Sequence, residues 1–144
     1  MSIQIEAVVE EGITILGTYF FYRYYSIQSV ELPKGLTKIR SSVFHSCTSL
    51  ISLSLPSTVS TLETHPFGNC ISLKEILVEG GSTTFKSIDG VLFTDDGSRL
   101  VQYPTGKKDE LYVVPEGTEF IQDLSFEASS IHTIQIPHTV TKIG

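Results

Sequence analysis

The sequence has few basic residues, few cysteines and no long apolar run. Its 10 lysines and arginines are scattered among 16 aspartates and glutamates, which gives a net charge of −6. Nucleic acids and anionic membrane surfaces are bound by clustered basic side chains, so this charge argues against both. No apolar stretch approaches the ~20 residues that a membrane-spanning helix needs. The sequence therefore predicts no nucleic-acid binding and no membrane insertion.

Motifs for catalysis and metal binding are missing as well. The sequence contains no Gly-x-Ser-x-Gly turn, no phosphate-binding loop and no paired acid and base. No spacing typical of a metal site gathers the four histidines, His45, His65, His132 and His138. Asp95 and Asp96 lack the further acidic residues of a calcium loop, and a hairpin turn explains them better. We therefore expect no enzyme activity, no metal and no cofactor.

What the sequence does contain is a repeat of 23 residues. The spacing is kept by three sets of apolar residues: Phe21, Phe44 and Phe67; Leu16, Ile39 and Leu62; and Ile27, Leu50 and Leu73. A period between about 20 and 50 residues is typical of a solenoid, in which each repeat buries its apolar face against its neighbours. A later copy contains Phe126 and is one residue shorter.

Each repeat contains a short strand that ends at a corner. Apolar and polar residues alternate in Leu53-Ser54-Leu55, which predicts a half-buried strand. Proline then ends the strand in several repeats, at Pro33, Pro56, Pro115 and Pro137. Ser41 and Ser42 precede Val43-Phe44 and are predicted to cap a single helical turn.

We divide the chain, as one domain, into coils and one insertion. The predicted segments are a partial coil (1–11), three repeats (about 12–34, 35–57 and 58–79), an insertion (about 80–108), a strand with a further repeat (about 109–137) and a second partial coil (138–144). Within the insertion, Val91–Phe93 and Arg99–Tyr103 are predicted to form a β-hairpin. The insertion is too short for a core of its own, so we expect it to pack against the solenoid.

The cysteines occupy one column of the repeat. Cys47 and Cys70 should lie in neighbouring coils about 5 Å apart, close enough for a disulfide. The equivalent positions hold Tyr24 and Ser129, however, which suggests a packing position. Free cysteine is among the most buried residue types, so we expect two buried free thiols.

The run from Leu50 through Leu73 resembles the BspA-type leucine-rich repeat. It reads Leu-x-x-Leu-x-Leu-Pro-x-x-Val-x-x-Leu-x-x-x-x-Phe-x-x-Cys-x-x-Leu. The resemblance covers nearly the whole chain, although Tyr24 and Ser129 depart from the cysteine column. It implies an α/β fold, a right-handed leucine-rich-repeat solenoid with short strands, short helical turns and one inserted β-hairpin. It also implies a cell-surface or secreted microbial protein that adheres to host proteins, such as components of the extracellular matrix. No signal peptide is visible in this chain.

Candidate contact residues come from departures from the repeat. Leu77, Leu111 and Val113 are apolar at outward strand positions where neighbouring coils have polar residues. An exposed apolar patch rimmed by polar groups often marks a contact site. We add Glu75 and Ile51 from the same outward columns. The alternative is that the inserted hairpin covers these residues.

A second candidate is the aromatic run from Tyr19 to Tyr25. We expect Phe20, Phe21 and Tyr24 to point inward, which leaves Tyr19, Tyr22 and Tyr25 outward as possible partner contacts, because tyrosine and arginine anchor interfaces. The alternative is that these three tyrosines shield the end coil.

The leading hypothesis is a non-enzymatic protein-binding module. One alternative is a structural spacer within a larger protein, and another is an enzyme with an unrecognised site around Asp89, Asp95 and Asp96. Apolar residues at both ends predict end-to-end self-association, namely Ile5, Val8, Val9, Val140 and Ile143.

Overall fold

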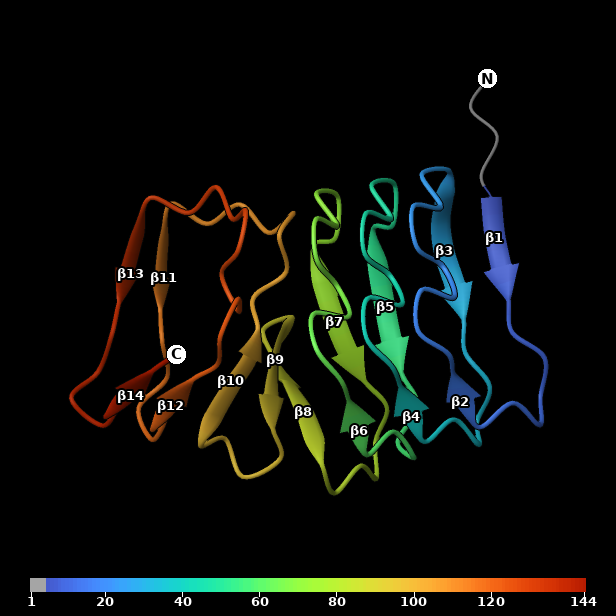
Figure 1. Ribbon diagram of the computed structural model, residues 1–144. Helices are drawn as coiled ribbons and strands as arrows, with labels where there is room; N and C mark the ends of the chain where they lie inside the picture. The colour runs from blue at the N-terminus through green and yellow to red at the C-terminus, as the bar shows by residue number, and fades with distance from the viewer. Residues whose placement is uncertain (1–4) are drawn as a thin grey trace.

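The computed structural model describes residues 5–144 as a β-solenoid of about six turns (Figure 1). Each coil has a first strand and a second strand. The first strands are β1 (Ile5–Val8), β3 (Ile27–Glu31), β5 (Ser52–Leu55), β7 (Glu75–Val78), β11 (Leu111–Val113) and β13 (Thr133–Gln135). The second strands are β2 (Ile15–Leu16), β4 (Lys38–Ile39), β6 (Thr61–Leu62), β10 (Arg99–Gln102), β12 (Phe120–Ile121) and β14 (Lys142–Ile143). The insertion adds β8 (Phe85–Ile88) and β9 (Val91–Thr94).

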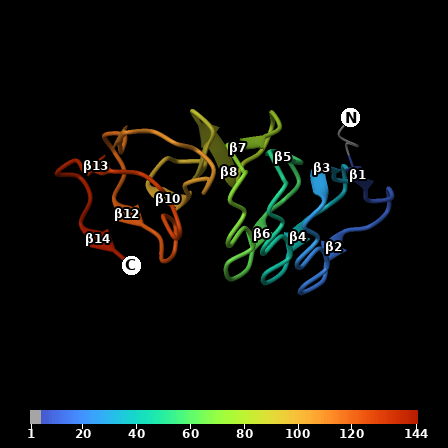
Figure 2. The same cartoon turned by 90° about the horizontal axis from the view of Figure 1, so that it is seen from above.

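The 23-residue period sets the register of the parallel ladders in the N-terminal coils. Ser52 pairs with Glu75, and Lys38 pairs with Thr61, each pair being one period apart. The first strands pair as β1 with β3, β5 with β7 and β11 with β13, and the second strands form the order β2-β4-β6. Figure 2 shows the first and second strands of the N-terminal coils along opposite sides of the stack. The space between them is the core.

The predicted short helical turns are wrong, because residues 5–144 contain no helix. Four of the five turns that connect a second strand to the next first strand within residues 5–144 have two non-glycine residues with positive φ, four positions apart. The pairs are Tyr19 and Arg23, Ser42 and Ser46, His65 and Asn69, and Leu124 and Ala128. A left-handed residue cannot continue a right-handed helix, so too few residues remain between the two for a helical turn. The turns instead donate hydrogen bonds to the next coil, such as Phe21 N–H to the Val43 carbonyl at 2.9 Å.

The core has two parts. In the first, the Phe21 and Phe44 rings stack with centroids 5.5 Å apart, and the Phe44 and Phe67 rings stack at 5.9 Å. Phe126 does not continue this column directly. It packs in a second core, where its ring stacks on Tyr103 at 5.2 Å. The molecule therefore consists of two stacks of coils, each with its own core, and we call the boundary between them the seam.

The insertion supplies the first coil of the second stack. The hairpin of β9 and β10 is confirmed, and β8 adds a third antiparallel strand that the sequence analysis missed. Its signal was present, since Asp89-Gly90 between two apolar runs is typical of a two-residue hairpin turn, and both residues have positive φ. β10 then pairs in parallel with β12, so the last strand of the predicted insertion belongs to the solenoid.

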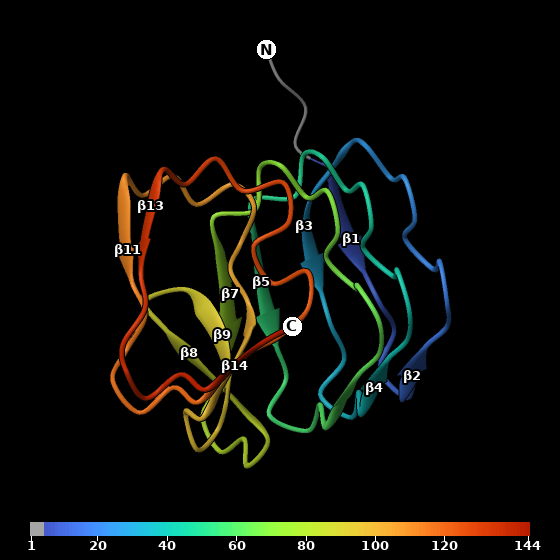
Figure 3. The same cartoon turned by 60° about the vertical axis from the view of Figure 1, so that its left-hand side comes forward.

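The insertion also breaks both ladders. On the side of β7 that faces away from β5, the Asp89-Gly90 turn takes the place of a strand. Ile76 N–H donates to the Gly90 carbonyl at 2.9 Å, and the Ser87 hydroxyl donates to the Ile76 carbonyl at 2.6 Å. β11 pairs only with β13 within residues 5–144, and Figure 3 shows this pair standing apart from β7.

Candidate protein-binding surface

The apolar strand residues predicted to face outward are exposed. Leu77 is 38% exposed, Leu111 52% and Val113 53%. The alternative that the hairpin covers them is wrong, because the hairpin turn packs against the edge of β7 rather than over its outer face.

The structure does not bring all five candidate strand residues together. Ile51, Glu75 and Leu77 lie on the β5–β7 side of the ladder break, where the Ser52 hydroxyl donates to Glu75 at 3.1 Å. Leu111 and Val113 lie on β11, on the other side of the break. The candidate surface is therefore two separate faces.

A hollow of about 240 Å³ adjoins β11. It is lined by Ile88, Asp89, Asp109, Leu111, Tyr112, Val113 and Pro115. Tyr112 is buried and forms the inner wall, whereas Leu111 and Val113 project outward. We call this hollow with the edge of β11 the break surface. It was missed in the sequence because residues 88–89 and 109–115 meet only once the insertion has folded.

Lys107 holds the acidic side of the break surface in place. Its ammonium lies 3.0 Å from Asp109 and 3.6 Å from Asp89, and the buried Tyr103 hydroxyl donates to Asp109 at 2.8 Å. Burial raises the pKa of Tyr103, and its hydrogen bond to Asp109 raises it further, so the phenol remains a donor. One lysine against two carboxylates leaves the break surface with a net negative charge.

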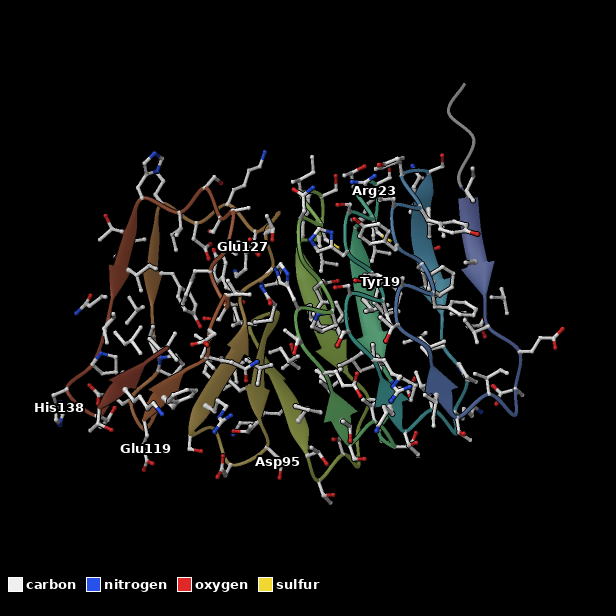
Figure 4. The ribbon with its side chains drawn as sticks, in the orientation of Figure 1. Tyr19, Arg23, Asp95, Glu119, Glu127 and His138 are labelled. Atoms are coloured by element: carbon white, nitrogen blue, oxygen red, sulfur yellow. The ribbon has the colours of Figure 1, made fainter. Side chains whose placement is uncertain are left out.

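The aromatic run at the first turn is more exposed than predicted. Tyr19 and Tyr25 are exposed as expected, but Phe20 and Tyr24, predicted inward, are 53% and 55% exposed. They lie at the end of the stack, where the described residues supply no preceding coil to cover them. Tyr22 is half-buried against the His45 ring, with centroids 5.6 Å apart. Figure 4 labels Tyr19 and Arg23, which lie in the turn between β2 and β3.

Two histidines lie at the seam and were not predicted to meet. The repeat column of Tyr22 and His45 continues at Gly68, which has no side chain, and the His65 ring fills that space 5.1 Å from His45. His65 Nε2 contacts the Glu127 carboxylate in the second stack. Burial and the adjacent His65 lower the pKa of His45. The available signal was the glycine at position 68 in the column of Tyr22 and His45, because it leaves room for a neighbouring side chain.

A larger hollow, of about 870 Å³, lies between the two rows of second strands. Arg99 and Lys142 both lie over the Phe120 ring, at 4.5 and 5.2 Å from its centroid. Glu63 and Asp123 also line this hollow, so charges of both signs surround it. The arrangement has no nucleophile paired with a base.

The acids suspected of catalysis do not converge. Asp95 and Asp96 lie in the β9–β10 turn, at the opposite end of β9 from Asp89 (Figure 4 labels Asp95). Asp96 accepts hydrogen bonds from the Ser98 N–H at 3.0 Å and from the Ser98 and Thr94 hydroxyls, which lower the pKa of Asp96 to about 2. Asp96 thus orders a turn, as expected of this segment.

The cysteines are free and buried, as predicted. The Cys47 thiol donates to the Phe21 carbonyl at 3.1 Å, and the Cys70 thiol donates to the Phe44 carbonyl at 3.0 Å. Each thiol therefore links its coil to the preceding one. Burial raises the pKa of Cys47 to about 11 and that of Cys70 to about 12.

Residues 5–144 lack two further kinds of feature. These residues contain no group of three or more His, Cys, Asp or Glu side chains arranged to hold a metal ion. They also contain no helix of the length and apolarity that crossing a membrane requires.

The comparisons with known proteins agree with the repeat architecture. The model of the BspA-type leucine-rich repeat region matches residues 3–98 and 109–144 in six copies. The crystal structure of the pneumococcal vaccine antigen PcpA is similar to 98% of the chain, with a TM-score of 0.88 and 31% identity. A leucine-rich cell surface protein of Faecalibacterium prausnitzii is similar to 96% of the chain, with a TM-score of 0.84 and 26% identity.

A leucine-rich repeat protein of Eubacterium ventriosum shares the fold, with a TM-score of 0.71 and 17% identity over 96% of the chain. The chain spans 35%, 37% and 49% of the lengths of these three structures. No curated protein matches it. The family model covers most of the chain, and we conclude that the chain belongs to the BspA-type leucine-rich repeat family.

Proposed function

We propose that this chain is a non-enzymatic protein-binding module of a microbial cell-surface protein. Its contact surface is the face of β11, and its partner is a host protein such as a component of the extracellular matrix. The observation that carries the proposal is the exposure of Leu111 and Val113 beside a hollow, at positions where the paired strand has Thr133 and Gln135. Exposed apolar groups with polar neighbours are typical of contact sites.

The relatives support the cellular location. One similar structure is described as a vaccine antigen and another as a cell surface protein. Both are longer than this chain, so we assign the module's partner from its own surface and the location from theirs. A stacked repeat without converging acids and bases favours binding over catalysis.

A binding assay on immobilised extracellular-matrix proteins tests the proposal. Leu111→Ser with Val113→Ser should weaken binding at least about tenfold, because tenfold corresponds to about 1.4 kcal/mol and burying one Leu or Val contributes about 1.5–3 kcal/mol. Leu77→Ser is the matched control, since it makes the same kind of change on the other side of the break. Equal loss in the control and the double variant would contradict the choice of the β11 face.

The structural-spacer alternative predicts a different result. A spacer would bind none of the matrix proteins, and neither variant would change any property except stability.

Tyr19 and Tyr25 are the second proposed contact, and Tyr22 is less suited because it packs on His45. Replacing Tyr19 and Tyr25 by Ser should reduce binding with little change in melting temperature if they contact a partner, whereas a large fall in melting temperature would favour the shielding role.

We also propose that copies of the chain associate end to end. Ile5 and Val8 at one end and Ile143 at the other are exposed, whereas Val9 is buried and Val140 half-buried. The outer edges of β1 and β13 are unpaired within residues 5–144, and unpaired edges with apolar side chains promote association. Light scattering over a concentration series should show a rising mass, and a constant monomer mass would refute the proposal.

A further inference from the structure

We propose that β11 accepts an extended, basic segment of a protein partner as an added strand. The inference rests on the proposed function, because it uses the same face and specifies how the partner is bound. Addition of a strand to an exposed sheet edge is a recurrent mode of peptide recognition, with main-chain hydrogen bonds for affinity and alternate side chains for specificity.

The backbone of β11 has unused hydrogen-bonding groups. Thr133 N–H donates to the Glu110 carbonyl at 3.1 Å, and Val114 N–H donates to the Gln135 carbonyl at 2.9 Å. Even-numbered residues of this strand therefore bond to β13. The alternation along a strand directs the N–H and C=O groups of Leu111 and Val113 to the other side. No backbone or side-chain partner for these groups occurs within residues 5–144.

This open edge differs from those at the ends of the stack. The outer edges of β1 and β13 are the places where additional coils of a longer array would pair. The edge of β11 is internal, because the β8–β9 hairpin separates it from β7 in the same chain (Figures 1 and 3). Added coils at either end therefore leave it unpaired, and only a segment entering from the side can pair with it.

The hairpin does not compete for this edge. Gly90 and Ser87 already bond to β7, so the Asp89-Gly90 turn is anchored on the opposite side of the break. Between the turn and β11 lies the hollow of about 240 Å³. This hollow leaves room for a short run of backbone beside β11.

The side chains around the edge define the chemistry of the segment. A paired strand would place alternate side chains beside Leu111 and Val113 on the outer face, where apolar or β-branched residues pack well. Asp89 and Asp109 are the charged residues lining the hollow within residues 5–144, and Lys107 neutralises about one of them. The segment that fits is thus extended, with apolar residues alternating with at least one lysine or arginine.

The edge is held in place by the connection that precedes it. Gly106 N–H donates to the Leu73 carbonyl at 2.7 Å, and a Cβ at Gly106 would lie 2.5 Å from the backbone of Ser72. The connection is therefore fastened to the first stack, and Lys107 fastens it to the hairpin turn. An edge fixed in advance costs less ordering when a segment binds.

Amide hydrogen exchange, read by nuclear magnetic resonance, tests the inference on the whole chain. The Leu111 and Val113 amides should exchange at least tenfold faster than the Tyr112 amide. The probe is an acetylated, amidated peptide of sequence Thr-Val-Lys-Val-Lys-Val-Thr, with the same peptide carrying Glu for Lys as control. At saturation the lysine peptide should slow exchange at Leu111 and Val113 at least tenfold. No slowing at these two amides would overturn strand addition, and equal binding of the glutamate peptide would overturn the preference for a basic segment.

A pair of variants separates main-chain pairing from side-chain contact. Val113→Pro removes the Val113 N–H, which is the donor on the open edge, and leaves the hydrogen bonds between β11 and β13 in place. Proline is tolerated at such edge positions. Val113→Ala truncates the side chain and keeps the donor. The proline variant should bind the lysine peptide at least fivefold more weakly than the alanine variant, while slow exchange at Tyr112 confirms that β11 still pairs with β13. Equal weakening would leave the proposed function standing and reject strand addition. An unchanged affinity for matrix proteins after Leu111→Ser and Val113→Ser would instead reject the proposed function.

Discussion

Gly68→Ala should destabilise the protein through a steric conflict at the seam. A Cβ at this position would lie 2.5 Å from carbon atoms of both the His45 and His65 rings. Nonbonded carbon atoms prefer about 3.5–4.0 Å, so each ring would have to move by roughly 1 Å. Neither ring moves freely, because His45 Nδ1 lies 3.0 Å from the Ser46 hydroxyl and His65 contacts Glu127.

The expected magnitude follows from two opposing effects. Inserting a methyl group into a packed site costs about 1–3 kcal/mol. Replacing glycine by alanine also restricts the unfolded chain, which stabilises by about 0.4–1 kcal/mol where the backbone and space allow. The φ of Gly68 is not in the left-handed region, so the steric effect decides the sign. We expect a net loss of about 1–2 kcal/mol, which lowers the urea midpoint by roughly 0.5–1 M for an m-value of about 2 kcal/mol/M.

Two comparisons make the assay decisive. At Gly35 a Cβ would meet nothing within 4 Å and the φ is also ordinary, so Gly35→Ala should be neutral or slightly stabilising. In a His65→Ala background one of the two obstructing rings is gone, and Gly68→Ala should cost measurably less. The same loss in both backgrounds would refute the explanation, and so would a gain at Gly68 equal to that at Gly35.

Three further predictions follow from the core and the turns. Phe44→Ala should lower the free energy of unfolding by about 3–5 kcal/mol in urea titration, because it removes the middle ring of a stacked column. Cys47 and Cys70 should resist alkylation at pH 8 in the native protein and react fully once it is unfolded, with an intact mass that shows no loss of two hydrogens. The pKa of Asp96 lies below its ordinary 3.8, so its hydrogen bonds stabilise the turn above about pH 4 and are lost as the pH falls through about 2, which the Ser98 amide shift should report.

The regular coils could be predicted because the repeat length alone determines where each residue lies in its coil. A 23-residue offset gives the pairing partners among the N-terminal coils, as Ser52 and Glu75 illustrate, whereas the partners in the second stack are 21 or 22 residues apart. Period-two alternation gives the buried face of each strand. The 23-residue spacing also predicts that Tyr103 occupies the same column as Phe126. The structure agrees, because the Tyr103 N–H donates to the Ser125 carbonyl at 2.8 Å. The helical turns were predicted from family resemblance and a possible serine cap. The left-handed φ of Ser42 shows why that expectation failed.

The candidate site could be predicted only in part. The outward exposure of Leu77, Leu111 and Val113 followed from alternation within their strands. Their separation into two faces did not, because it depends on how far the hairpin displaces β11 from β7. No repeat carries that information, and it arises from contacts of the insertion, such as Gly90 with Ile76, that occur once in the chain.

The insertion therefore does more than lengthen one coil. In an unbroken ladder each internal strand uses both edges, and a partner can reach only side chains. Here both rows are interrupted, since β6 does not pair with β10, and the two stacks are joined instead by contacts such as Gly106 with Leu73 and His65 with Glu127. Breaking the first row beside β11 while these contacts hold the stacks together creates an internal strand edge without dividing the domain. That combination gives a structural repeat a main-chain recognition site, and it assigns specificity to the residues that do not repeat.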